Sequence, residues 1–283
     1  LIQNCGVGPT ACDGILLAGT GNRVRNCRIH DCNYSGADYA AIYLKAGSQV
    51  EISHNTISNS GRAHIFLEVN SRFGKCIIRN NHFKDHATLN SDCGAVYCWR
   101  TDGNGTEIYE NFVESGTRNN NGTLSKFRDG LYPDENSSNF RIFRNIVIGG
   151  TAGIRANLPS RGVSIENNTI IGSRNGLGFF FAGSVPGIPE TTVEGLLVRN
   201  NLFVGVQGFL VDYYGIENGR QASYHGPFVD GTVPLPVELL PKMESSGNTV
   251  GTVDSNYRPS GDTPEVGALK RSDSMFSYGA SSP

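Results

Sequence analysis

The feature that most limits the fold of this sequence is a short motif that recurs along the chain: an alternating segment with Asn near its end and an apolar residue after it. The copies read VRNCRI (24–29), VEISHNTI (50–57), CIIRNNHF (76–83), EIYENFV (107–113), RIFRNIVI (141–148), VSIENNTII (163–171) and LLVRNNLFV (196–204). Aligning them on Asn gives positions 26, 55, 81, 111, 145, 168 and 201, which are 23 to 34 residues apart. A period of this length indicates a solenoid, and the unequal steps predict loops of unequal length between constant strands.

A second repeat lies between the copies of the first and usually begins with a small residue. Its copies are DGILLAG (13–19), AAIYLKAG (40–47), AHIFLEV (63–69), GAVYCWR (94–100), DGLYPDE (129–135), AGIRANL (152–158), NGLGFFF (175–181) and GFLVDYY (208–214). Period-2 alternation predicts an inward column of Ile15, Ile42, Ile65, Leu131, Ile154, Leu177 and Phe209, joined by Leu17, Leu44, Leu67 and Val211. Helical solenoids are disfavoured because the period is 2, and antiparallel sandwiches because the motif keeps recurring in one direction.

These repeats predict an all-β fold, a single-stranded right-handed parallel β-helix with about eight rungs. We expect the rungs to occupy residues 1–214 and an irregular, Pro-rich C-terminal segment at 215–283 to cap the open strand edges. Ile2-Gln3-Asn4-Cys5 matches Val24-Arg25-Asn26-Cys27, so the chain begins within a rung, and we expect earlier coils or a cap to be missing or supplied elsewhere.

Stacked rungs place equivalent residues about 4.8 Å apart. The aligned Asn residues are therefore expected to form a ladder of amide hydrogen bonds, with Asn248 as its last position. The seven Cys residues show no zinc-site spacing, and we interpret most of them as small buried hydrophobes. Cys12 with Cys32, or Cys93 with Cys98, remain possible local disulfides in an oxidising compartment.

Charge and hydropathy limit the partners. The formal net charge is −2 and no basic stripe is present, which argues against nucleic acid. No apolar run approaches the length of a membrane span. The oligomeric state stays open.

The rungs resemble those of the pectate-lyase-like superfamily of right-handed β-helix proteins. The resemblance rests on GAVYCWRTDGNGTEIYENFVES (94–115), DGLYPDENSSNFRIFRNIVIGG (129–150), GIRANLPSRGVSIENNTIIG (153–172) and the C-terminal TPEVGAL (263–269). It implies a secreted or cell-surface protein, extracellular or periplasmic, that acts on a polysaccharide as a lyase, hydrolase or epimerase. The NTD, DD, GHG and RIK motifs of polygalacturonases and the WIDH-type segment of pectate lyases are absent, so the fold alone does not choose a reaction.

Two outward columns follow from the predicted inward column and form a groove suited to sugars. The first contains Leu16, Tyr43, Phe66, Val96, Tyr132, Arg155, Gly178 and Leu210, and the second contains Ala18, Lys45, Glu68, Cys98, Asp134, Asn157, Phe180 and Asp212. His64 is expected on the same face, and Trp99 either as a sugar platform or as a cap on the core edge. Tyr132, Arg155, Lys45, His64, Trp99, Tyr43, Glu135 and Asn157 are the predicted substrate-binding residues.

The predicted catalytic residues are the carboxylates Asp134, Asp102, Glu68 and Asp129. Like charges raise one another's proton affinity, which separates acid from base roles. Glycoside hydrolysis needs two carboxyl groups roughly 5 to 9.5 Å apart, which neighbouring rungs supply, so hydrolysis with Asp134 foremost is the favoured function.

Two alternatives stay open. A lyase acting on a uronate-containing glycan would use Lys45 or Arg155 as base, with Ca²⁺ possible at Asp102, Asp129, Asp134 and Glu135. A non-catalytic β-helix surface, spike or filament protein would carry the same carboxylates merely solvated.

Overall fold

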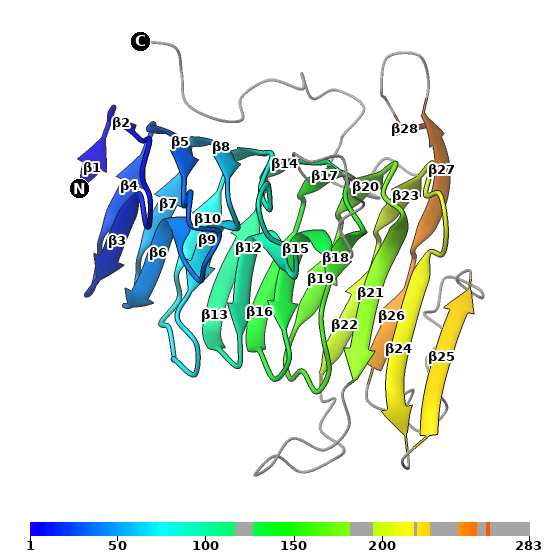
Figure 1. Cartoon of the computed structure of the whole chain (residues 1–283). Helices are drawn as coiled ribbons and strands as arrows, with labels where there is room; N and C mark the ends of the chain where they lie inside the picture. Colours follow the sequence, from blue (N-terminus) through cyan, green and yellow to red (C-terminus); the bar gives the residue numbers. More distant parts are fainter. Residues whose placement is uncertain (117–126, 182–194, 218–219, 227–242, 254–258, 261–283) are drawn as a thin grey trace.

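The computed structural model describes residues 1–116, 127–181, 195–217, 220–226, 243–253 and 259–260. In these ranges the chain winds through three strands per coil, and equivalent strands of successive coils pair in parallel to build three long sheets (Figure 1). Eight complete coils follow one another from β1 to β24, which confirms the predicted parallel β-helix and its number of rungs.

Sheet 1 consists of β1 (Ile2–Gln3), β4 (Arg23–Arg25), β7 (Glu51–Ser53), β10 (Ile77–Arg79), β13 (Asp102–Tyr109), β16 (Ser138–Phe143), β19 (Ser164–Glu166), β22 (Leu196–Arg199) and β26 (Met243–Ser246). Sheet 2 consists of β2 (Gly6–Val7), β5 (Arg28–Cys32), β8 (Thr56–Ser60), β11 (His82–Lys84), β14 (Phe112–Ser115), β17 (Ile146–Gly149), β20 (Thr169–Ile171), β23 (Leu202–Val204), β27 (Thr249–Val253) and the antiparallel β28 (Pro259–Ser260). Sheet 3 consists of β3 (Ile15–Ala18), β6 (Ala40–Ala46), β9 (Ala63–Leu67), β12 (Cys93–Trp99), β15 (Arg128–Asp134), β18 (Ala152–Arg155), β21 (Asn175–Phe181), β24 (Val211–Glu217) and the antiparallel β25 (Arg220–Gly226).

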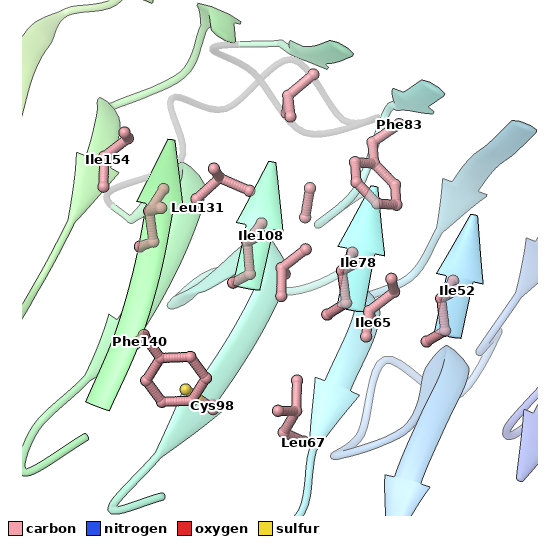
Figure 2. Close-up of a cluster of buried hydrophobic side chains, with 14 of the residues drawn as sticks. Ile52, Ile65, Leu67, Ile78, Phe83, Cys98, Ile108, Leu131, Phe140 and Ile154 are labelled. Atoms are coloured by element: carbon pink, nitrogen blue, oxygen red, sulfur yellow. The ribbon is translucent and has the colours of Figure 1, made fainter. Parts of the chain in front are cut away.

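The core is a continuous column of apolar side chains enclosed by the three sheets. Figure 2 shows part of it, with Ile52, Ile78 and Ile108 from sheet 1 beside Ile65 and Leu131 from sheet 3. Because each coil adds one slice and each slice packs on the next, burial along the whole helix stabilises the fold.

The turn between sheets 1 and 2 carries the Asn ladder. Asn81 illustrates it: its Oδ1 accepts from the backbone N–H and the side-chain amide of Asn55, while its own Nδ2 donates to Asn111 Oδ1 at 3.0 Å and to the carbonyl of Ile52 at 2.9 Å. The same pattern continues through Asn111, Asn145, Asn168, Asn201 and Asn248. The ladder is therefore confirmed, including its last position.

The first predicted rung of the ladder is wrong by one residue. Asn26 adopts a left-handed conformation with φ 51°, which lets the chain turn sharply before the ladder position. Cys27 occupies that position instead, and its backbone N–H donates to Asn55 Oδ1 at 2.9 Å.

The registers of sheet 3 correct the assignment of four residues, two in the fourth coil and two in the eighth. In the fourth coil Val96 pairs with Ile65 and Leu131 and is buried, so Tyr97 takes the outward place expected for Val96, and Cys98 lies in the core. In the eighth coil Val211 pairs with Leu177, while Phe209 is exposed. Asp212 therefore belongs to the first outward column, which the sequence pattern gave to Leu210, because its partner is Gly178.

All seven Cys residues are free thiols, and five of them, Cys27, Cys32, Cys76, Cys93 and Cys98, are buried as predicted. Neither Cys12 with Cys32 nor Cys93 with Cys98 is bridged. Most of the expected C-terminal cap, including TPEVGAL, lies outside the described residues; the strands described there are β25, β26, β27 and β28, of which β26 and β27 extend sheets 1 and 2 in parallel. In the described ranges we find no helix with the length and apolarity to cross a membrane.

Candidate functional site

An aromatic column runs along the outward face of sheet 3. The rings of Tyr43, Phe66, Tyr97 and Tyr132 follow one another on consecutive coils, with centroids 5.0, 5.4 and 5.2 Å apart. Parallel pairing in register produces this column, because residues at the same outward position stack directly above one another. Rings at this spacing pack favourably, and Phe66, Tyr97 and Tyr132 are buried.

A pocket of about 260 Å³ opens beside the C-terminal end of this column. Its lining residues come from four consecutive coils and are Asp92, Trp99, Phe127, Tyr132, Asp134, Glu135, Asn157 and Phe180. Four aromatic rings and three carboxylates thus face one small space. Such a mixture of apolar ring faces and hydrogen-bonding groups suits a sugar ring.

Asp134 forms a buried wall of the pocket and is held by three hydrogen bonds. Tyr97 donates its hydroxyl to Oδ2 at 2.8 Å, while Asn157 Nδ2 and the backbone N–H of Glu135 donate to Oδ1, each at 2.7 Å. Burial raises the pKa of Asp134 above its ordinary value, and the three donated hydrogen bonds oppose this shift. The net effect favours retention of a proton at higher pH than in an exposed Asp.

Asn157 fixes the geometry between two of the pocket carboxylates. Its Oδ1 accepts from the backbone N–H of Phe180 at 3.0 Å, so its Nδ2 must point toward Asp134 and toward the hydroxyl of Tyr132, which lies 2.7 Å away. Tyr132 in turn donates to Asp92 Oδ1 at 3.3 Å. Burial and the nearby Asp134 raise the pKa of Tyr132, so its hydroxyl stays a donor.

Glu135 is the carboxylate with cationic and indole partners. Its Oε2 accepts from Trp99 Nε1 and from the guanidinium of Arg100, both at 3.2 Å. The Arg100 guanidinium also lies over the Trp99 ring, 4.4 Å from its centroid. This arrangement orients a charged carboxylate at the pocket rim without burying it completely.

Arg155 and Asp129 form a buried ion pair next to the pocket. The distance from Arg155 Nε to Asp129 Oδ2 is 2.6 Å, and Asp129 Oδ1 also accepts from the backbone N–H of Ala152 at 2.7 Å. The guanidinium lies 5.0 Å from the Phe127 ring centroid and 5.7 Å from that of Tyr132. Arg155 therefore supports the aromatic wall, and both charges are satisfied within the protein.

The family model described as "Right handed beta helix region" matches residues 13–223. The chain belongs to the right-handed β-helix family. Comparison with curated proteins and with solved structures finds no match. For this β-helix protein the family match therefore supports the architecture, and the chemistry has to be derived from the pocket itself.

The β-helix brings five of the predicted site residues together at one pocket: Asp134, Glu135, Tyr132, Trp99 and Asn157. Arg155 lies behind them, with its charge paired to Asp129. The structure places these residues on the outward side of sheet 3 or directly after its strands, as the sequence pattern indicated.

Other predicted residues lie elsewhere. Asp102 is at the start of β13, where it pairs with Arg72 at 3.3 Å and accepts from Asn139 Nδ2 at 2.8 Å. Glu68 lies two coils before Asp134, with Trp99 between them, and is hydrogen-bonded to the hydroxyl of Tyr43. Lys45 is exposed on β6, four coils before Arg155 and outside the pocket lining.

The expectation that His64 faces the groove is wrong. His64 is fully buried: one ring nitrogen lies 2.8 Å from Ser60 Oγ, the other lies 3.0 Å from the carbonyl of Lys84, and the ring stacks on Phe83. At the corner between sheets 2 and 3 two consecutive residues point inward, as Ala95 and Val96 also do, so strict alternation fails there.

The four carboxylates suggested for Ca²⁺ do not converge. Asp102 pairs with Arg72 and Asp129 with Arg155, which leaves only Asp134 and Glu135 at the pocket. Across the part of the chain that the structure describes, no group of three or more His, Cys, Asp or Glu side chains is arranged to hold a metal ion.

The sequence pattern missed Asp92, Tyr97 and Phe127. Tyr97 was missed because the sequence pattern assigned Val96 to the outward position that Tyr97 occupies in the fourth coil. Asp92 and Phe127 immediately precede β12 and β15, outside the period-2 segments. Their position just before a strand of sheet 3 was the available signal, because such loop residues lie at the edge of the groove.

Proposed function

We propose that this β-helix protein is a secreted or cell-surface glycoside hydrolase that binds one unit of a polysaccharide in the pocket around Asp134. The observation that carries the proposal is a buried carboxyl group with a raised pKa, fixed by three hydrogen bonds, in an aromatic-lined pocket that holds two further carboxylates. A polysaccharide chain could extend from this pocket along the stacked coils, and a secreted protein would meet such polymers outside the cell.

Asp134 is assigned the role of proton donor. A general acid must carry a proton near the working pH, and burial shifts Asp134 in that direction. Tyr97 and Asn157 hold the carboxyl group in one orientation, which positions its proton relative to the glycosidic oxygen.

Glu135 is assigned the role of the second carboxylate. The indole of Trp99 and the guanidinium of Arg100 both donate to its Oε2, which fixes the orientation of this carboxylate. A charged carboxylate beside a protonated one is the combination that hydrolysis of a glycosidic bond requires. Asp92, linked to Asp134 through Tyr132 and Asn157, binds sugar hydroxyl groups in this scheme.

The pocket offers less for a lyase. Elimination needs a base and a cationic group that neutralises the uronate carboxylate. The described residues that line the pocket contain no Lys, His or Arg, and the neighbouring Arg155 is already paired with Asp129. Lyase activity is therefore an outcome of the test below.

The test is a screen of plant, algal and microbial polysaccharides with the wild-type chain and with Asp134→Asn. We expect new reducing ends with at least one polysaccharide, and a loss of at least about 100-fold in rate for Asp134→Asn because a positioned general acid contributes that much. Circular dichroism in the far ultraviolet should be unchanged, since Asn has the shape of Asp. The matched control is Asp31→Asn. Asp31 lies on sheet 2, away from the pocket, and its left-handed backbone conformation is one that Asn tolerates.

The outcomes separate the alternatives. Full activity of Asp134→Asn would remove Asp134 from the mechanism. Products that absorb in the ultraviolet through a conjugated double bond would identify a lyase, because only elimination forms that bond. The absence of both signals across the screen would favour a non-catalytic β-helix protein.

A further inference from the structure

A second pocket, of about 380 Å³, lies where sheet 3 ends and sheet 1 begins. It is polar, and its lining residues are Asn70, Ser71, Arg72, Arg100, Asp102, Asn136, Ser138 and Arg161. We refer to this set as the arginine pocket. Three of its lining residues are arginines and one is a carboxylate, and Glu135 of the first pocket pairs with one of these arginines, Arg100.

Stacking of consecutive coils creates the arginine pocket. Isolated parallel bridges connect Arg72 to Asp102 and Ser138 to Arg161, and Asp102 pairs with Ser138, so these four residues form one column on four coils. Arg100 and Asn136 come from the neighbouring position on two of the same coils, both with left-handed φ, 52° and 57°. The arginines thus converge through the same repeat that builds the core.

The positive charge of the arginine pocket is not fully balanced within the protein: Arg72 pairs with Asp102 and Arg100 with Glu135, whereas Arg161 has no carboxylate partner among the described residues. Asp102 is already shared between Arg72 Nε at 3.3 Å, Asn139 Nδ2 at 2.8 Å and the backbone N–H of Asn104 at 2.8 Å. The Nε atoms of Arg100 and Arg161 are buried and have no hydrogen-bond acceptor among the described residues. Buried N–H donors without acceptors are unfavourable, and an anion in the pocket would supply acceptors for these two Nε atoms and a counter-charge for Arg161.

The two pockets adjoin. Trp99 and Glu135 line the first pocket, and the residues that follow them in the chain, Arg100 and Asn136, line the arginine pocket. The stacked pair of Trp99 and Arg100 therefore separates the two spaces. A polymer with one sugar beside Asp134 would present its next substituent to the arginines.

We propose that the arginine pocket binds an anionic substituent of the glycan, a carboxylate or a sulfate ester, on the sugar next to the one beside Asp134. This inference rests on the proposed function, and it narrows the substrate to an acidic polysaccharide. Guanidinium groups recognise planar carboxylates and sulfate oxygens through paired N–H donors, which neutral hydroxyl groups do not match in strength.

The test is calorimetric titration of Asp134→Asn, which prevents turnover, with three probes: galactotriose, trigalacturonic acid and a sulfated galactan trisaccharide. We expect at least one anionic trisaccharide to bind at least about tenfold more tightly than galactotriose, because hydrogen bonds to charged groups contribute at this scale. The better of the two anionic probes identifies the substituent. A second substitution in this protein, Arg161→Gln, should weaken the binding of the preferred anionic probe about tenfold. The control substitution Arg141→Gln removes an equally charged side chain, which pairs with Glu107 on sheet 1, and should leave this binding unchanged.

Titration with inorganic sulfate separates this inference from the proposed function. Sulfate binding that Arg161→Gln weakens and Arg141→Gln preserves would support the anion site even if no glycan were cleaved. Equal binding of neutral and anionic probes, or equal effects of the two substitutions, would overturn the anion site, even if cleavage depended on Asp134.

Discussion

At the scale of single residues, the buried His64 shows how position in the coil decides chemistry. Its ring is enclosed between Phe83 and His86, and burial lowers its pKa to about 3. His86 beside it is also buried, and burial lowers its pKa as well. Both imidazoles therefore remain neutral over the whole range in which an exposed His would take up a proton, and neither is available to a substrate.

We predict that His64 makes the fold sensitive to acid. The unfolded chain binds a proton at His64 below pH ~6.5, whereas the folded chain does so only near pH 3. The contribution of the neutral His64 to the free energy of unfolding is therefore complete above pH ~6.5 and is lost as the pH falls toward 3. A change from pH 7 to pH 4.5 should therefore lower the free energy of unfolding by about 2.5 kcal/mol through His64 alone. Urea unfolding at both pH values measures the loss, which should be smaller by that amount in His64→Gln. An equal loss in wild type and variant would contradict the assignment.

At the scale of strands and turns, the sequence predicted two recurring strand segments per coil and most of the outward face of sheet 3, whereas the division into three sheets came from the structure. Asp134, Tyr132 and Asn157 could be placed because Leu131 is the only aliphatic residue of DGLYPDE and Ile154 lies between Gly153 and Arg155, which makes the alternation unambiguous. The register of GAVYCWR could not be predicted, because Val96, Tyr97 and Cys98 are all apolar enough to face either way. The loop residue Asp92 could not be placed because its position depends on the path of the turn before β12.

The contribution of the Asn ladder to stability can be tested at Asn111. Its Oδ1 accepts from the backbone N–H and the amide of Asn81, and its Nδ2 donates to Asn145 Oδ1 and to the carbonyl of Ile78. Asn111→Ala leaves these buried groups without partners and should lower the free energy of unfolding by about 3 kcal/mol. Exposed Asn90→Ala, which loses only loop hydrogen bonds, should cost less than about 1 kcal/mol. Chemical denaturation measures both, and equal losses would argue against a structural ladder.

At the scale of the whole molecule, each coil contacts only its neighbours, so stability passes along the β-helix through adjacent coils. Besides the Asn ladder, polar side chains also join successive coils where sheet 3 carries the pocket. Asp129 joins Arg155 one coil further on, and Asp134 joins Tyr97 on the coil before and Asn157 on the coil after. The site is therefore joined by hydrogen bonds and an ion pair to the coils on both sides of it, and a rigid support of this kind is what a positioned acid requires.

This arrangement predicts opposite roles for two neighbouring carboxylates. Asp129→Asn leaves the buried Arg155 without its counter-charge and should lower the free energy of unfolding by about 3 to 5 kcal/mol. Asp134→Asn keeps the shape of the side chain: its Oδ1 still accepts from Asn157 and Glu135, and its amide donates to the Tyr97 hydroxyl, which can also accept. It should change stability by less than about 1 kcal/mol while it removes the proposed acid. Urea unfolding of both variants, read beside their hydrolytic rates, distinguishes the two roles. Because the coils depend on one another, Asp129→Asn should also impair the neighbouring pocket, whereas a stable Asp129→Asn protein with full activity would show that the ion pair supports neither the fold nor the site.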